Sequence, residues 1–220
     1  MPIVLPPDLT VPQTAIWLEQ QLFAGRPIYN TGQVITIRGD LRVDLFEIAL
    51  RATVAESPHL QLPPRRGPVP FDMTLLDFRT DSEPQAAADK WMRTEMRKAI
   101  PVDGPALFRF ALIRIDEDHT LWFQKYHHII IDATGRRLLC ARTAARYRAL
   151  RFAEPLPAFD AVTPKQVLDA ERNYTSSAQH EADRAYWVDR FAQWPPPLVD
   201  INRQNTERAR SGVQSLSLLL

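Results

Sequence analysis

Two apolar segments separated by a short polar turn constrain the fold of this chain most strongly. Residues 106–115 and 120–128 are rich in Leu, Ile, Phe and Trp, whereas Asp116–His119 between them are polar. Segments of this length and composition around a short turn predict a β-hairpin. We expect this hairpin to lie at the centre of the sheet.

Amphipathic patterns elsewhere alternate between helix and strand. Helical spacing of apolar residues predicts helices over residues 12–23, 41–56, 82–100, 136–150, 164–174 and 178–193. Thr10 and Ser82 are the expected N-caps of the first and third of these helices. Strand-like runs occur at residues 33–38 and 213–220, whereas residues 59–80 are less regular, with one short apolar run at 73–76. This alternation indicates an α/β protein.

Composition is that of an ordinary globular protein. The chain has 220 residues, of which 45% are hydrophobic and 24% charged, enough for one or two lobes. A net charge of +1 offers no strong field, so we expect neither nucleic acid nor membrane as a partner. A single cysteine, Cys140, and an N-terminus without a basic or long apolar region predict a cytoplasmic protein.

A histidine pair ends the second arm of the hairpin, in the sequence YHHIIIDATG at residues 126–135. Neighbouring residues of a strand point to opposite faces, so one histidine can face an open channel while the other packs inward. Histidine is the usual group for moving a proton near neutral pH. Asp132, four residues after His128, can orient the site or hold the loop.

A purely structural role and a metal site both compete with a catalytic role for these residues. Two histidines and an aspartate in a strand and turn are often only structural. For a metal site, the side chains of adjacent histidines diverge and no cluster elsewhere supplies further ligands, so we expect no metal. The remaining histidines, His59, His119 and His180, lie in polar surroundings, and we expect them to be solvated.

These residues resemble a signature of condensation domains of nonribosomal peptide synthetases. His127, His128, Asp132 and Ala133 match the family's His-His-x-x-x-Asp-Gly motif, after a hairpin and before a helix. Other family motifs agree in order and spacing: TVPQTAIW at residues 10–17, RPIYN at 26–30, VDGPALFR at 102–109 and Tyr186-Trp187. The Tyr-His-His context is similar to modules that join an aryl acid to an amino acid in siderophore synthesis.

The resemblance implies a fold similar to chloramphenicol acetyltransferase, with two α/β lobes around a channel. Residues 1–175 would form a two-layer sandwich lobe, and residues 176–220 the crossover and the beginning of a truncated second lobe. It also implies amide formation between a donor thioester and an acceptor amine, each on the phosphopantetheine arm of a carrier protein. No cofactor would be bound directly, and an adenylation domain is expected downstream.

Residue roles follow from the same resemblance. His128 would lie in the channel and take the amine proton or position the amine, and His127 would shape the loop. We expect Asp132 to accept backbone N–H bonds from the next helix or to pair with an arginine, without contacting His128. Support of the motif and the substrate channel is expected from Tyr126, Ala133, Gly135, Gln13 and Trp17.

Three departures from the family pattern leave alternatives open. Ala133 replaces a glycine and would be strained if its φ were positive. Gln61 replaces an arginine, and the segment between Leu62 and Phe71 is short where the family forms a β-ribbon. One alternative is an acyltransferase of the same fold that uses a coenzyme A thioester and needs only His128 and Asp132. The other is a non-catalytic relative that docks a carrier protein.

Overall fold

A computed structural model of the chain describes residues 8–61, 69–156, 158–160 and 162–193. The strand expected at 213–220 and most of the short segment expected to lack a ribbon lie outside these residues. The chain divides into two compact units, Met1–Asn173 and Tyr174–Leu220. In the part of the chain that the structure describes, no helix combines the length and apolar character needed to cross a membrane.

Helices and strands alternate along the first unit, as the sequence predicts. Its elements are α1 (Val11–Leu22), β1 (Asn30–Arg38), α2 (Val43–Ala55), the 3-10 turn η1 (Pro58–Gln61), β2 (Met73–Asp77), α3 (Pro84–Arg97), β3 (Phe108–Arg114), β4 (His119–His127) and α4 (Ala133–Phe152). Helix α5 (Pro164–Thr175) runs across the boundary between the units, and α6 (Ala178–Arg190) lies in the second unit.

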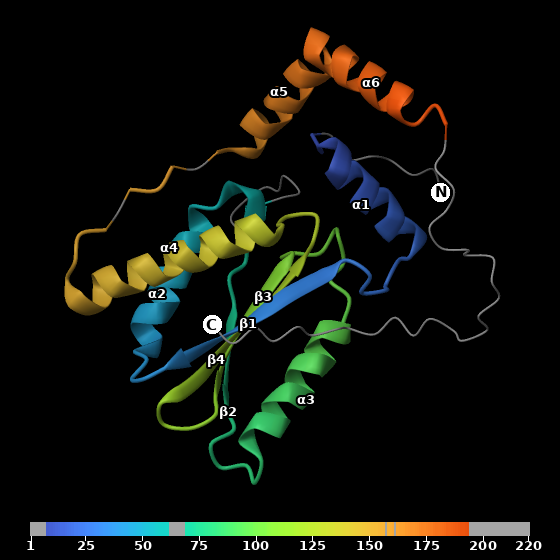
Figure 1. Cartoon of the computed structure of the whole chain (residues 1–220). Helices are drawn as coiled ribbons and strands as arrows, with labels where there is room; N and C mark the ends of the chain where they lie inside the picture. Colours follow the sequence, from blue (N-terminus) through green and yellow to red (C-terminus); the bar gives the residue numbers. More distant parts are fainter. Residues whose placement is uncertain (1–7, 62–68, 157, 161, 194–220) are drawn as a thin grey trace, which may run out of the picture. The chain divides into compact units, whose positions relative to one another are not determined.

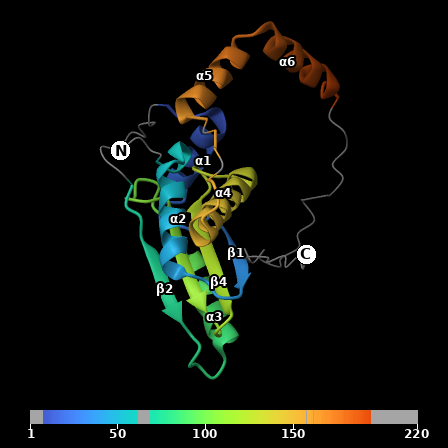
Figure 2. The same ribbon diagram turned by 90° about the vertical axis from the view of Figure 1, so that its left-hand side faces the viewer.

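Four strands form one mixed sheet in the order β1-β4-β3-β2. Strand β4 is antiparallel to both β1 and β3, so Phe123 lies opposite Val34 on one side and Ala111 on the other. Strands β2 and β3 are parallel, which requires a crossover, and α3 supplies it. The predicted central hairpin is therefore confirmed, and Figure 2 shows β1 and β2 at opposite edges of the sheet.

Side chains of β3 and β4 are buried on both faces of the sheet. One core lies between the sheet and helices α2 and α4, and it includes Phe46, Leu50, Phe110, Trp122, Tyr126 and Leu139. A second core on the other face, packed against α3, includes Ala88, Ala111, Ile113, Leu121 and Phe123. From the sequence we expected a two-layer sandwich, with helices on one face of a sheet. Helix α3 covers the other face and adds a third layer (Figure 1).

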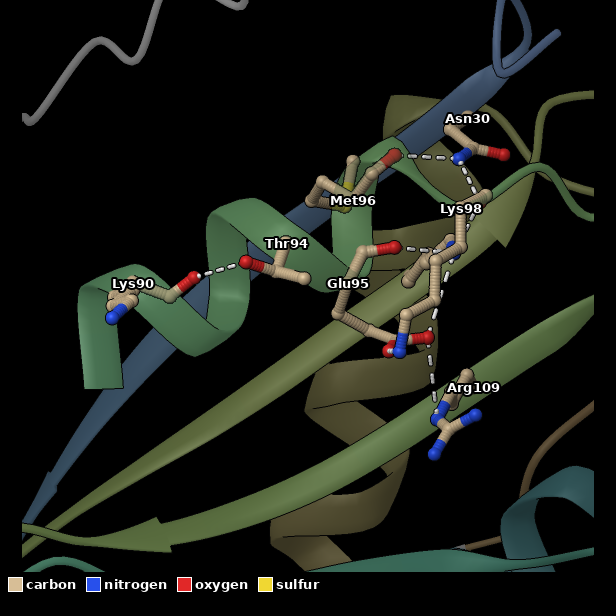
Figure 3. A network of polar contacts seen from close by, with 8 residues as sticks. Asn30, Lys90, Thr94, Glu95, Met96, Lys98 and Arg109 are labelled. Carbon is tan, nitrogen blue, oxygen red and sulfur yellow. Dashed lines mark hydrogen bonds and ion pairs between the residues drawn. The ribbon is translucent and has the colours of Figure 1, made fainter. Parts of the chain in front are cut away.

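A buried polar network joins the C-terminal end of α3 to two strands (Figure 3). Glu95 and Lys125 are each 2% exposed. The Lys125 ammonium donates to the backbone carbonyls of Glu95 (2.7 Å) and Lys98 (2.6 Å), and the Asn30 amide donates to the Lys98 carbonyl at 2.7 Å. The last carbonyls of a helix have no partner within the helix. The network therefore caps α3 and fixes it beside the end of β4.

Several predicted boundaries were wrong by two or three residues. Helix α3 begins at Pro84 after the N-cap Glu83, and not after Ser82, because proline suits the first helical position, where no N–H is needed. Strand β1 begins at Asn30 and α4 at Ala133, three residues before the predicted starts. The predicted N-cap Thr10 is confirmed, since its side chain accepts from the Gln13 N–H.

Candidate active site

The two adjacent histidines at the end of β4 differ in exposure, as the alternation of a strand predicts. His127 is the last residue of β4 and is 1% exposed, whereas His128 begins the following turn and is exposed. The turn continues through Ile129 and two further isoleucines, all buried, to Asp132. Only one of the two rings is therefore open to a substrate.

Hydrogen bonds hold His127 in a single neutral form. Its Nδ1 accepts the backbone N–H of Ile129 at 3.2 Å, so the ring proton lies on Nε2, which donates to Oε1 of Gln20 at 3.3 Å. Burial, with a smaller contribution from the charge of His128, lowers the pKa of His127 to about 4. His127 is therefore neutral near pH 7 and holds the turn instead of exchanging protons.

His128 has the opposite arrangement of ring nitrogens. Its Nδ1 lies 2.8 Å from the backbone carbonyl oxygen of Ile131. A carbonyl can only accept, so Nδ1 carries the proton and the neutral ring leaves Nε2 as an acceptor. The backbone N–H of His128 donates to the carbonyl of Tyr29 at 2.8 Å. This is the geometry of a general base whose ring is oriented by a backbone carbonyl.

Asp132 is the N-cap of α4. Its Oδ1 accepts the backbone N–H of Gly135 at 2.7 Å. Among the described residues, no hydrogen bond joins Asp132 to His128, and no arginine forms an ion pair with Asp132. The prediction that Asp132 bonds to the backbone of the next helix is confirmed, and its alternative, pairing with an arginine, is not seen in this part of the chain.

The other residues of the motif support the turn from different sides. Ala133 is the first residue of α4 and does not have a positive φ, so alanine is not strained there. A Cβ at Gly135 would lie 2.8 Å from the Ile131 side chain, so the close approach requires glycine. Tyr126 is completely buried and donates to Gln124 at 2.7 Å. It therefore supports β4 from the core and does not line a channel.

Helix α1 fixes the same turn through two glutamines. The Gln13 amide donates to the backbone carbonyl of Ile129 at 3.0 Å, and its oxygen accepts from Thr10. Trp17, also on α1, packs against the core between the sheet and helices α2 and α4. Gln20, which binds His127, was not predicted as a site residue. Its spacing of seven residues from Gln13, two helical turns, was the available signal.

A pocket of about 440 Å³ adjoins the histidine turn. Its walls include Trp17 and Gln20 from α1, Ile100 and Val102 from the loop after α3, and Ile129. Its lining is mostly apolar, and Gln20 and Ile129 also hydrogen-bond to the ring nitrogens of His127. The pocket and the histidine turn therefore share walls.

The expectation of solvated histidines outside the motif was wrong for two of them. His59 is partly buried, and burial, followed by the charge of Arg142, lowers its pKa, while Asp132 opposes this shift. The side chain of His119 is 12% exposed. Within the described ranges, no three His, Cys, Asp or Glu residues gather in a way that could hold a metal ion.

Two of the curated proteins that this chain resembles are large peptide synthases. The chain is 34% identical over 198 residues to the dimodular nonribosomal peptide synthase of Bacillus subtilis (strain 168), covering 86% of this chain and 8% of that protein. It is 34% identical over 206 residues to the isonitrile lipopeptide synthase of Streptomyces coeruleorubidus, covering 89% of this chain and 14% of that protein. The chain thus spans a small part of these relatives.

Solved structures agree with the sequence comparison. The starter condensation domain of rhizomide synthetase RzmA superposes with a TM-score of 0.80 at 34% identity, covering 86% of this chain and 46% of that one. The first condensation domain of the CDA synthetase gives a TM-score of 0.75 at 30% identity, with 86% and 51% covered. The condensation-domain family matches residues 8–218. This chain therefore belongs to the condensation-domain family of nonribosomal peptide synthetases, and it spans about half of the solved domains that it matches.

Proposed function

We propose that the protein carrying this chain forms an amide bond between a carrier-bound acyl thioester and a carrier-bound amine, with His128 at the reacting centre. The observation that carries this proposal is the ring of His128. It is exposed at the end of β4, its Nδ1–H is engaged by the Ile131 carbonyl, and its Nε2 is therefore the acceptor. An oriented, neutral imidazole is suited to accept a proton from an attacking amine.

The proposed reaction balances through this nitrogen. The amine nitrogen attacks the thioester carbonyl and forms the C–N bond, while Nε2 of His128 takes the proton that the amine loses. Collapse of the tetrahedral intermediate breaks the C–S bond, and the leaving thiolate of the donor phosphopantetheine arm takes the proton from Nε2 of His128, which regenerates the neutral imidazole. His127 holds the turn, and Asp132 holds the first turn of α4, so neither is needed as a proton carrier.

Relatives support this assignment. One solved form of the RzmA starter domain carries substitutions of a histidine and an arginine that are eight residues apart. His128 and Arg136 have the same spacing in this chain. We include in the proposal the boundary after residue 175, donor and acceptor carrier proteins as partners, a downstream adenylation domain and a cytoplasmic location.

A second candidate is an acyl transfer that uses a coenzyme A thioester as the donor. The observation that favours it is the solved RzmA starter domain in complex with C8-CoA, a relative at 34% identity. The non-catalytic alternative loses part of its basis, because Ala133 is not strained.

The test is amide formation by the full-length protein, with the acyl donor supplied either on a carrier protein or as a coenzyme A thioester. We expect His128→Ala to slow product formation by about 100-fold or more, since proton transfer in the transition state contributes at least this much. His180→Ala, in the second unit, is the matched control and should keep wild-type turnover. Wild-type turnover in His128→Ala would place the chemistry elsewhere, and a product only with coenzyme A would favour the second candidate.

A further inference from the structure

The side chain of Gln20 lies buried between α1 and the histidine turn. It is 6% exposed, and its Nε2 donates to the backbone carbonyls of Phe23 at 3.0 Å and Arg26 at 3.2 Å. An amide nitrogen only donates and an amide oxygen only accepts. The two carbonyls therefore decide which end of the amide faces His127, and that end is the oxygen.

The orientation of Gln20 in turn determines the proton position on His127. An acceptor at Nε2 requires the proton there, which leaves Nδ1 to accept the N–H of Ile129. In the other tautomer, or in the doubly protonated ring, an N–H at Nδ1 would face the N–H of Ile129 without an acceptor. The two backbone carbonyls that follow α1 thus influence the position of Ile129 through the side chains of Gln20 and His127.

Fixing Ile129 also fixes the ring of His128. The backbone N–H of His128 is bound by the Tyr29 carbonyl, and the next N–H, that of Ile129, is bound by His127. The acceptor of the His128 ring, the Ile131 carbonyl, lies two residues further along the same turn. A displaced Ile129 therefore moves both the Cα of His128 and the carbonyl that orients its ring.

We infer that Gln20 is a positioning residue that sets the tautomer of His127 and through it the orientation of His128. This inference rests on the proposed function, which makes His128 the reacting group. Gln20 contacts no reacting atom, and its effect is expected on turnover more than on substrate binding.

The first test replaces Gln20 by methionine in the full-length protein, with Gln85→Met as the matched control. Gln85 is an exposed residue of α3, and its amide donates to Asp89 of the same helix. We expect Gln20→Met to change the 15N ring signals of both His127 and His128 in histidine-labelled protein. It should also lower kcat by about 10- to 100-fold, with little change in KM, since a misplacement near 1 Å costs about this much. Gln85→Met should change neither.

The second test uses Gln20→Glu, which keeps an acceptor for His127 but adds a negative charge. The titratable groups near His127 in the described structure are His128, next in the chain, and Tyr29, whose ring centre is 6.0 Å away. A carboxylate at position 20 favours the imidazolium, so the midpoint of the His127 titration should rise. The kcat of this variant should then fall as the pH falls through the new midpoint.

Several outcomes would overturn the inference. One is a wild-type ring signal for His127 or a wild-type kcat in Gln20→Met. Another concerns the Gln20→Glu variant. The inference fails if the midpoint of the His127 titration rises in this variant while its kcat falls at the same low pH as in the wild type. If the wild-type protein forms no amide at all, the proposed function fails separately. In that case the His128 ring signal in Gln20→Met, compared with Gln85→Met, decides the positioning role alone.

Discussion

The ring of His128 is oriented by the main chain, and the nearby carboxylate of Asp132 has a different task. The Ile131 carbonyl accepts from Nδ1 of His128, and Asp132 accepts from the first turn of α4. A carboxylate partner would stabilise the imidazolium strongly, whereas a carbonyl dipole does so less. In the part of the chain that the structure describes, no charged group is hydrogen-bonded to the ring of His128, and its Nε2 remains an acceptor.

This division of tasks predicts different effects for two substitutions of Asp132. Asp132→Asn keeps an N-cap acceptor, so the free energy of unfolding and the turnover should stay near the wild-type values. Asp132→Ala removes the cap and should lower the free energy of unfolding by about 0.5–2 kcal/mol, measured by urea denaturation of the full-length protein. An Asn variant as slow as His128→Ala would show instead that the carboxylate charge acts in catalysis.

Residue patterns predicted the immediate neighbours in the chain but not the distant contacts. Two adjacent histidines on a strand must diverge, and an aspartate before a helix is a typical N-cap, so both outcomes followed from local geometry. The contact between Gln20 and His127 joins residues 107 positions apart. No local spacing specifies which side chain of α1 meets the end of β4, because this depends on how the helix packs.

At the scale of elements, the network at the end of α3 makes one carboxylate important for stability. Burial would raise the pKa of Glu95, but the hydrogen bond from Lys98 and the charges of Arg109 and Lys125 outweigh it and lower the pKa. Burial also lowers the pKa of the Lys125 ammonium, which the Glu95 charge opposes. The two buried charges, with Nζ of Lys125 3.6 Å from Oε1 of Glu95, therefore depend on each other.

We expect acid to weaken this network through Glu95. Its pKa is lower in the folded than in the unfolded chain, so its contribution is complete above the unfolded value and is lost as the pH falls through the folded value. Glu95→Gln should lower the free energy of unfolding at pH 7 by about 1–3 kcal/mol, because Lys125 loses its charged partner. The difference from wild type should shrink in urea denaturation below about pH 4, where carboxylates protonate.

Glu47→Gln on α2 is the control for this experiment. Glu47 pairs with Arg51 on an exposed helix face, where ion pairs contribute little. A Glu95→Gln variant as stable as Glu47→Gln at pH 7 would contradict the proposed dependence of Lys125 on Glu95.

Most element types were predictable from sequence, whereas β2 was expected only as a short apolar run, and element ends depended on tertiary pairing. Asn30 and Gly32 have low strand preference, but the first three residues of β1 pair with the last three of β4. A Cβ at Gly32 would lie 2.4 Å from the Gln124 carbonyl oxygen, so this pairing needs glycine at a position just outside the predicted strand. The start of β1 therefore depends on its pairing with β4 and could not be predicted from residues 30–38 alone.

At the scale of the whole molecule, the buried core belongs to the first unit. Every buried apolar residue of the described part of the chain precedes Asn173, and α6 contributes none. The proposed boundary after residue 175 thus leaves the sheet, its two cores and the histidine turn on one side.

Removing residues 176–220 tests that boundary. Because the cores remain intact, the shortened chain should unfold cooperatively, with a midpoint within about 4 °C of the 220-residue chain, a difference worth about 1 kcal/mol. Thermal unfolding followed by circular dichroism measures this. Loss of the cooperative transition would mean that residues beyond 175 are part of the same folding unit.

The strand order also sets the time at which the histidine turn can form during synthesis. Asn30 of β1 pairs with His127 of β4, so the two are 127 − 30 = 97 residues apart in the chain. A ribosome that adds about 5–20 residues per second needs roughly 5–20 s between them. Throughout that interval the nascent β1 has no partner in its sheet, and its backbone groups are open to other chains. His127 is the last residue of β4 to pair with β1, so the proposed reacting group, His128, is placed only when this pairing is complete.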